Sequence, residues 1–185
     1  MLTLFFLFFP EKNFAPMPVT TIRPATSKDL SCIRELAQRI WPVAYGRLLS
    51  KAQLDYMLSL FYTEESLREQ MSAGQEFFLV AEKETVLGFA AVGPVASGVW
   101  KLHKLYILPQ EQGRGLGKAL LDHVATHARS KGAAALILQV NRENPARHFY
   151  VHEGFKIIEE KDFDIGSGFF MNDFVMKKNF KEQFL

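Results

Sequence analysis

The sequence predicts an α+β domain with a mixed, mostly antiparallel central sheet and helices on both faces. Three observations indicate this fold class. Three strand-like runs follow one another with only short polar or Gly/Pro turns between them, which predicts an antiparallel meander. A strand, a helix and a second strand then follow in order, which predicts a right-handed parallel crossover. Two further strand-like runs close the chain as a hairpin.

The front of the chain is predicted to be a strand followed by helices. Residues Val19–Arg23 form the strand-like run. Ser27 is placed to cap a helix whose apolar residues have helical spacing, and Pro42 is expected to end that helix. Ser50 and Gln53 match a capping box ahead of a second helix.

The rest of the chain supplies most of the sheet. The meander is expected over 76–81, 86–92 and 99–107. A helical pattern begins at Gly117 and ends at Gly132, where glycine is a common helix terminator. Residues Ala135–Val140 are continuously apolar, which is typical of a strand covered on both faces. A short helix and the closing hairpin are expected over 145–154, 155–161 and 169–177.

Composition indicates one globular domain without a polyanion partner. Of the 185 residues, 48% are hydrophobic and 23% are charged, which is enough for one domain with its own core. Lys and Arg number 22 against 20 Asp and Glu, without long runs of one sign, so no nucleic-acid or membrane partner is indicated. Cys32 is the only cysteine, which excludes an intrachain disulfide and favours a cytoplasmic location.

The apolar stretch at the start of the chain is interpreted as an extension. Residues 1–18 are expected to lie outside the core, and 19–180 are expected to form a single domain. The nine residues that open this extension are almost wholly apolar, but a transmembrane helix needs about twenty. No basic residue precedes them, as one would in a signal peptide.

The most informative segment is a glycine-rich turn between a strand and a helix. Glycines occupy alternate positions at 113, 115 and 117, with Arg114 and Lys118 among them. Without Cβ atoms a ligand can reach the backbone, and the first N–H groups of a helix are unpaired. The helix dipole and the two cations favour a pyrophosphate as the ligand. The spacing fits neither a P-loop nor the dinucleotide fingerprint, and an ordinary glycine-rich connection is the alternative.

The turn resembles the coenzyme A motif of the GNAT acetyltransferases, Q/R-x-x-G-x-G/A, at Gln112, Gly115 and Gly117. A second stretch, 144–155, is similar to another motif of that family. The resemblance covers most of the chain and is strongest over 101–155. The end of the chain resembles the bacterial small-amine and polyamine acetyltransferases. The resemblance implies the acyl-CoA N-acyltransferase fold.

The same resemblance implies a site for acetyl-CoA, with no metal. The backbone of Leu105 and Ile107 would pair with the pantetheine arm, the amides of the glycine turn would bind the pyrophosphate, and Asn144 would bind the pantetheine from the other side. The family separates its fourth and fifth strands at this place to form a slot for the acyl group. The positions assigned to coenzyme A in this way are Leu105, Tyr106, Ile107, Gln112, Gly113, Arg114, Gly115, Leu116, Gly117, Lys118, Asn144 and Tyr150.

Acetylation of an amine needs a neutral amine, stabilisation of the oxyanion and a proton for the leaving thiolate. By analogy with the family, the Tyr150 hydroxyl protonates the sulfur, and a backbone N–H near Leu108 stabilises the oxyanion. His103 is a candidate general base because the usual pKa of imidazole suits that role, and a structural hydrogen bond is its alternative role. Asp173, Glu76 and a chain of waters are the other candidates for moving the proton.

Side chains of the helical front end and of the last hairpin are candidates for the acceptor site. Asp173 is expected to pair with a cationic amine, and the walls are expected to come from Trp41, Tyr45, Tyr56, Phe169 and Phe170. Packing in the core is the alternative role for each aromatic residue.

The sequence as a whole therefore predicts an N-acetyltransferase that moves an acetyl group from acetyl-CoA to a primary amine by direct attack. A small molecule or polyamine is the favoured acceptor. A protein N-terminus or lysine as acceptor, and a non-catalytic coenzyme A sensor, are the alternatives. No metal is expected, because the helical pair His123 and His127 lacks the glutamate of a zinc-protease motif. Family members often dimerise through sheet edges, which favours a homodimer.

Overall fold

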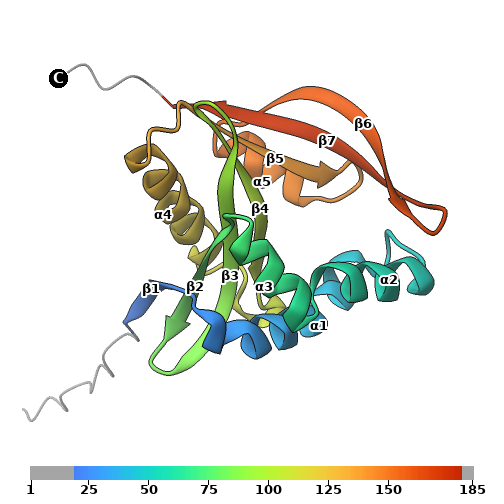
Figure 1. Ribbon diagram of the computed structural model, residues 1–185, viewed down its shortest axis with the longest axis horizontal. Coiled ribbons are helices and arrows are strands. Elements are labelled where there is room, and N and C mark those ends of the chain that lie inside the picture. The colour runs from blue at the N-terminus through green and yellow to red at the C-terminus, as the bar shows by residue number, and fades with distance from the viewer. Residues whose placement is uncertain (1–18, 181–185) are drawn as a thin grey trace, which may run out of the picture.

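The computed structural model describes residues 19–180, which form a seven-stranded sheet in the order β1-β2-β3-β4-β5-β7-β6 (Figure 1). The strands are β1 (Thr20–Pro24), β2 (Glu76–Glu82), β3 (Thr85–Ala96), β4 (Val99–Ile107), β5 (Ala135–Asn141), β6 (Lys156–Gly166) and β7 (Phe169–Asn179). The helices are α1 (Leu30–Tyr45), α2 (Lys51–Phe61), α3 (Glu64–Ser72), α4 (Leu116–Ser130) and α5 (Ala146–His152), with short 3-10 turns η1 (Ser27–Asp29) and η2 (Pro109–Glu111). Neighbouring strands are antiparallel except β4 and β5, which are parallel. The predicted mixed, mostly antiparallel sheet is therefore confirmed.

Helices cover both faces of the sheet, as the alternation of side chains along β2 makes clear. The ring of Phe78 lies 5.0 Å from the rings of His123 and His127 on α4. Its neighbour Phe77 points to the other face, where the Lys104 ammonium lies 5.6 Å from the ring centre and bonds to Gln70 of α3. Figure 1 shows α4 on one side of β2 and β3, with α1 and α3 on the other. The predicted arrangement of helices is confirmed.

The apolar extension, 1–18, lies outside the described residues. Among residues 19–180, no helix has the length and hydropathy that a membrane span requires.

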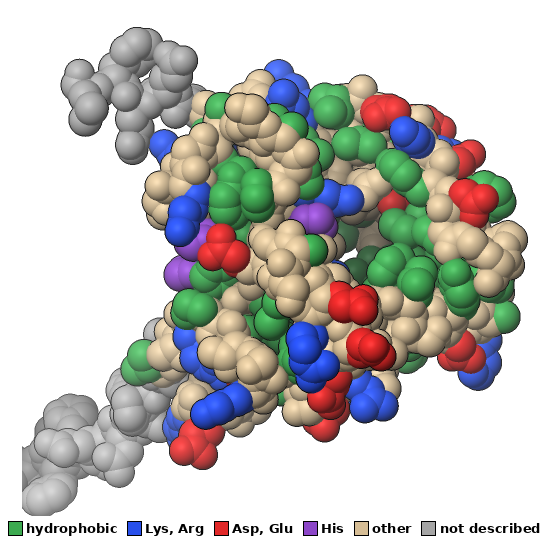
Figure 2. All heavy atoms as spheres, in the orientation of Figure 1, with side chains coloured by type: hydrophobic (Ala, Val, Ile, Leu, Met, Phe, Trp, Pro, Cys, Tyr) green, Lys and Arg blue, Asp and Glu red, His purple; other side chains and the backbone are tan. Residues whose placement is uncertain are grey.

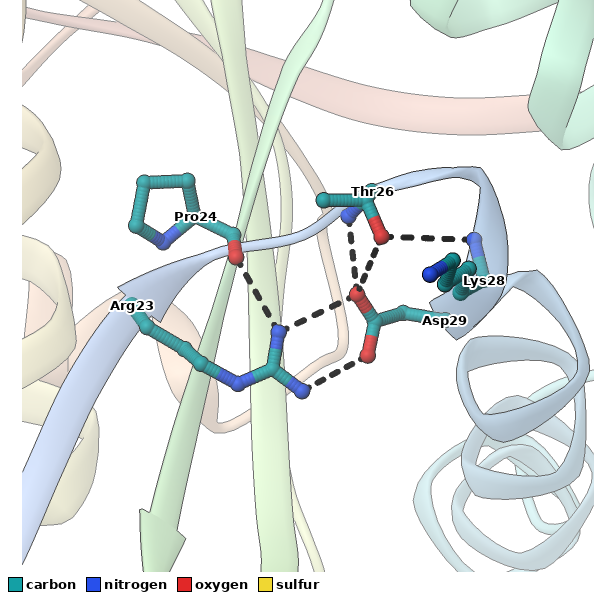
Figure 3. Close-up of polar contacts among 5 residues, drawn as sticks. All are labelled: Arg23, Pro24, Thr26, Lys28 and Asp29. Carbon is teal, nitrogen blue, oxygen red and sulfur yellow. Dashed lines mark hydrogen bonds and ion pairs between the residues drawn. The ribbon is translucent and has the colours of Figure 1, made fainter.

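The helical segment that begins with η1 and continues as α1 is capped one residue earlier than predicted. Thr26, and not Ser27, accepts a hydrogen bond from the amide of Lys28, and the Thr26 amide donates to the Asp29 carboxylate at 2.8 Å (Figure 3). Arg23 donates two hydrogen bonds to the same carboxylate, at 2.6 and 3.1 Å. These bonds lower the pKa of Asp29 to about 2. The Asp29 carboxylate thereby ties the end of β1 to the start of α1.

The prediction that Pro42 ends the first helix is wrong. The helix continues for three residues beyond it, to Tyr45. Proline lacks the N–H that would bond four residues back, but its carbonyl still accepts, and Pro42 O receives the Gly46 amide at 3.1 Å. The extra turn brings Tyr45 up to the sheet, where its hydroxyl lies 3.2 Å from that of Tyr106.

Strands β4 and β5 separate halfway along their length. Their parallel pairing runs from Val99 with Ala135 to Leu102 with Leu138 and then stops, although β4 continues to Ile107. On its other edge, β4 remains paired with β3 as far as Ile107. One edge of the second half of β4 therefore has no partner strand.

Candidate functional site

The space between the separated strands is a cavity of about 640 Å³. Its walls come from the second half of β4, the glycine turn and start of α4, β5, α5 and the end of α1. All the positions that the sequence assigned to coenzyme A line this cavity except Arg114, and they are Leu105, Tyr106, Ile107, Gln112, Gly113, Gly115, Leu116, Gly117, Lys118, Asn144 and Tyr150. Residues from two motifs that are far apart in the sequence thus meet around one cavity.

The glycine turn leaves backbone amides free at one end of the cavity. Gly115 is the N-cap of α4, with φ of +79° and no side-chain cap. The first N–H groups of a helix lack intrahelical acceptors, so those of Leu116, Gly117 and Lys118 are available to a ligand. A Cβ built on Gly113 or Gly115 meets no atom within 4 Å, so the space beside the turn is open. This geometry suits an anion held by backbone amides.

The two cations of the turn are placed differently. Arg114 lies outside the cavity lining and pairs with Glu111 and, at 2.5 Å, with Glu82. Lys118 lines the cavity and pairs with Asp122 at 2.9 Å and Glu153 at 3.1 Å. Of the two side chains, only Lys118 is therefore positioned to add positive charge beside the free amides.

The unpaired edge of β4 has a defined set of outward-facing groups. The Leu108 amide donates to Leu87 O at 2.8 Å, so this N–H points toward β3. In an antiparallel strand the N–H and C=O groups of one residue point to the same side, and those of the next residue point to the other side. Because the Leu108 N–H faces β3, the N–H and C=O groups of Leu105 and Ile107 point away from β3 and into the cavity. The Leu108 N–H is therefore not available to an oxyanion, and a donor near Leu108, as predicted, has to be another amide of this edge. The amides of Leu105 and Ile107 are the donors left on this edge.

Asn144 and Tyr150 form the opposite wall of the cavity. Both side chains are nearly buried, at 9% exposure, yet both line the cavity. Asn144 Oδ1 accepts the Ala146 amide at 2.9 Å, which orients its side chain at the start of α5. Burial raises the pKa of Tyr150 above its ordinary value, so its hydroxyl keeps its proton.

His103 lies at a β-bulge of β4. Leu102 faces Val92 and Lys104 faces Ala91, which leaves His103 as the extra residue. The bulge interrupts the alternation that predicted a shared face for His103, Leu105 and Ile107, but His103 still lines the cavity. Burial, followed by the charges of Lys101 and Lys104, lowers the pKa of His103 to about 4. Its imidazole is therefore neutral at physiological pH.

A tyrosine cluster closes the inner end of the cavity. Tyr45 and Tyr106 both line it, and the Trp41 ring lies 4.8 Å from that of Tyr45. Trp41 itself is 4% exposed and lies behind this wall, so it belongs to the core. Tyr62, which sequence reasoning did not select, packs edge-on against Trp41 at 5.2 Å and Tyr106 at 6.5 Å. Tyr62 follows α2 in a short connection, where no periodic pattern marks it as a partner of β4.

Lys104 is a further cavity residue that sequence reasoning missed. It is 7% exposed, its ammonium donates to Gln70 Oε1 at 2.5 Å, and the same group lies 5.4 Å from the centre of the Tyr62 ring. Burial, with a smaller contribution from Lys101, lowers the pKa of Lys104 to about 7. A lysine among alternating apolar residues of a strand was the available signal.

This burial predicts that the free energy of unfolding rises with pH between about 7 and 10.5. Below pH 7 the folded and unfolded proteins both hold the Lys104 proton, so the folded protein bears the full free-energy cost of a buried charge. Above pH 7 the folded protein releases this proton while the unfolded protein keeps it up to its pKa of 10.5, so the cost disappears over this range. Lys104→Met should flatten this rise. Urea unfolding at pH 7 and pH 9.5 measures it, and an equal rise in the variant and the wild type would contradict the assignment.

Of the remaining predicted site residues, Asp173 is buried, at 3% exposure, and pairs across the sheet with Asn141 at the end of β5. Burial raises its pKa to about 6, partly offset by the charges of Lys101 and Arg142. Phe170 is 45% exposed at the hairpin tip, outside the cavity. Glu76 bonds to His127 Nε2 at 2.9 Å on the α4 side, so it is not a neighbour of the cavity.

Comparison with known proteins gives consistent matches. A family model described as an acetyltransferase (GNAT) domain matches residues 49–171. An uncharacterized N-acetyltransferase of Bacillus subtilis, YuaI, is 29% identical over 152 residues, which are 80% of this chain and 86% of that protein. Spermidine N(1)-acetyltransferase of Thermoplasma acidophilum is 28% identical over 166 residues, covering 86% of this chain and 97% of the relative.

Solved structures give the same result. The crystal structure of PaiA N-acetyltransferase from Thermoplasma acidophilum in complex with coenzyme A superposes with a TM-score of 0.75 at 26% identity, over 88% of this chain and 99% of the other. The ribosomal-protein-S18-alanine N-acetyltransferase of Escherichia coli has a TM-score of 0.67 at 19% identity, over 90% and 99% of the two chains, which shows a shared fold. The family match spans about two thirds of the sequence, including the glycine turn and the second motif. The chain therefore belongs to the GNAT acetyltransferase family and is an N-acetyltransferase.

Proposed function

We propose that this enzyme transfers the acetyl group of acetyl-CoA to the primary amine of a small cationic molecule, such as a polyamine. The assignment of acetyl-CoA rests on one observation: free backbone amides and an unpaired strand edge line the same cavity. The amides of Leu116 to Lys118 suit the pyrophosphate, and the outward-facing groups of Leu105 and Ile107 suit the amide-containing pantetheine arm, which would add to β4 like another strand. A relative of similar fold has been crystallised with coenzyme A.

The acceptor assignment rests on Asp173. A buried carboxylate is costly unless a positive group pairs with it, and no hydrogen bond within residues 19–180 contributes to the pKa of this one. Lys101, the cation with the largest effect on its pKa, instead donates to Gln139 Oε1. An incoming ammonium group would supply the missing partner. The similarity to a spermidine acetyltransferase supports the same acceptor class.

In the proposed reaction the neutral amine attacks the thioester carbonyl directly, without a covalent enzyme intermediate. The outward amide of Leu105 or Ile107 stabilises the oxyanion, and the Tyr150 hydroxyl provides the proton for the departing sulfur. The nitrogen proton leaves through Asp173 or bound water, because the carboxyl of Asp173, with its pKa of about 6, binds protons more strongly than His103 does.

The test of this function is the release of free CoA thiol from acetyl-CoA across a panel of amines. The panel contains linear diamines and polyamines, amino acids and a short peptide with a free N-terminus. We expect release that depends on the amine and is greatest with the diamines and polyamines. Binding of acetyl-CoA without turnover on any amine would favour a sensor role, and turnover on the peptide alone would favour a protein acceptor.

A second prediction concerns His103. With a pKa of about 4 its imidazole is a weak base, so His103→Gln is expected to lower kcat by less than about threefold and to leave the pH profile unchanged. Steady-state kinetics from pH 5 to 9 with the best amine of the panel measures this. A fall of about 100-fold, with a shift of the acid limb of the profile, would instead identify His103 as the base.

A further inference from the structure

The tip of the β6–β7 hairpin is bonded to helix α2, far from it in the sequence. The Tyr56 hydroxyl donates to Ile165 O at 2.7 Å, and Gln53 Nε2 donates to Phe170 O at 2.7 Å. The rings of Tyr56 and Phe169 lie 5.4 Å apart. We call these contacts of Gln53 and Tyr56 with the hairpin tip the latch.

The backbone of the tip is shaped to meet Tyr56. Gly166, Ser167 and Gly168 have φ values of +88°, +54° and +77°, so the turn uses three successive left-handed residues. A Cβ on Gly166 would lie 2.8 Å from the Tyr56 hydroxyl oxygen, so a side chain at this position would displace the latch. The contact between the hairpin tip and Tyr56 therefore depends on glycine at position 166.

The latch closes a ring around a hollow in the molecular surface. Figure 1 shows the hairpin arching away from the sheet toward α2, and Figure 2 shows the surface hollowed between them. Asp173 lies on β7, opposite Asn141 at the end of β5, and is not part of the lining of the cavity between β4 and β5. Its charge also influences Tyr45, which lines the cavity between β4 and β5. Asp173 is therefore close enough to the cavity wall to act electrostatically on Tyr45.

A closed ring restricts what can pass through it. A slender chain that carries an amine at its end would pass through it more readily than an amine on a folded or bulky carrier. The latch consists of two side-chain hydrogen bonds and one ring contact, and Gln53 and Tyr56 are only partly buried, so substitutions can release it without disturbing the core.

We propose that Gln53 and Tyr56 are specificity-determining residues, which hold the hairpin across the acceptor entrance so that the enzyme favours amines on slender, unbranched chains. This inference rests on the proposed function, because it requires that the acceptor enter through the hollow. Neither residue touches the cavity that would hold acetyl-CoA. Their effect is on access, and they take no part in the chemical step.

The test compares the wild type with the double variant Gln53→Ala, Tyr56→Phe. The phenylalanine keeps the ring contact with Phe169 and removes only the hydroxyl bond to Ile165. Ser59→Ala is the matched control, because Ser59 donates to Tyr56 O within α2, and its loss removes a hydrogen bond of the helix without touching the hairpin. Two acceptors are used, 1,4-diaminobutane and a hexapeptide with an N-terminal alanine.

We expect the ratio of kcat/KM for the peptide to that for the diamine to rise at least tenfold in the double variant and to change less than twofold in Ser59→Ala. Hydrogen exchange of the amides in 162–172 should become faster only in the double variant. An unchanged ratio despite faster exchange would overturn the role in specificity, and unchanged exchange would show that these bonds do not hold the hairpin. A wild-type enzyme that acetylates neither compound would contradict the proposed function itself, and this inference with it.

Discussion

Gly115→Glu is expected to weaken coenzyme A binding at least 100-fold and to lower kcat/KM for acetyl-CoA by a similar factor. Gly115 caps α4 at φ +79°, with open space where a side chain would begin. The new carboxylate would take the free amides itself and place a negative charge where the pyrophosphate has to bind. Calorimetric titration with coenzyme A measures the loss of affinity.

The same substitution also strains the backbone, and a control has to separate the two effects. A non-glycine residue in the left-handed region costs about 1–2 kcal/mol. Gly132 is matched in this respect, with φ +88° and no atom within 4 Å of a built Cβ, but it follows the other end of α4. Gly132→Glu should lower the thermal midpoint about as much as Gly115→Glu while binding coenzyme A normally. If Gly115→Glu binds coenzyme A with an affinity within threefold of the wild type, the pyrophosphate does not bind at this turn.

The glycine turn was predictable because its chemistry is local. Alternate glycines, two cations and a following helix lie within a few consecutive residues, and a match to a family motif needs nothing else. The strands were predictable for a similar reason, since each is a short run with its own pattern. The observed strands are longer than predicted mainly where pairing with a neighbouring strand extends them. An example is β6, which is predicted to end at 161 and continues to Gly166.

Most features that sequence reasoning missed depend on contacts between distant segments. The N-cap at Thr26 is an exception, because Thr26 and Asp29 form a capping box that is visible in the local sequence, and only the bonds from Arg23 of β1 to Asp29 are long-range. Lys104 faces the tyrosine cluster because a bulge at His103 shifts the alternation of β4 by one residue, and a bulge leaves no signal in composition. The latch joins side chains of α2 to main-chain carbonyls at a hairpin tip, and main-chain acceptors are the same at every position.

Tyr150→Phe is expected to lower kcat about 100-fold while changing the affinity for acetyl-CoA by less than twofold. The ring stays, so its contacts with Phe149 and Phe155, at 5.2 and 5.8 Å between centroids, are preserved. No hydrogen bond with residues 19–180 contributes to the pKa of this tyrosine, so the variant should fold with nearly unchanged stability. What is lost is a proton donor on the wall of the cavity.

A control variant, and not the pH dependence of that loss, distinguishes an acid from a packing residue. An exposed tyrosine ionises near pH 10, but burial raises the pKa of Tyr150, so its hydroxyl remains protonated throughout the range of an enzyme assay. The ratio of wild-type to variant kcat should therefore be constant from pH 6 to 9. Tyr62→Phe is the control, since Tyr62 is also buried but lies outside the cavity lining. If both variants lose the same activity, the tyrosines act through packing; if Tyr150→Phe keeps its full kcat, the proton for the thiolate comes from another group.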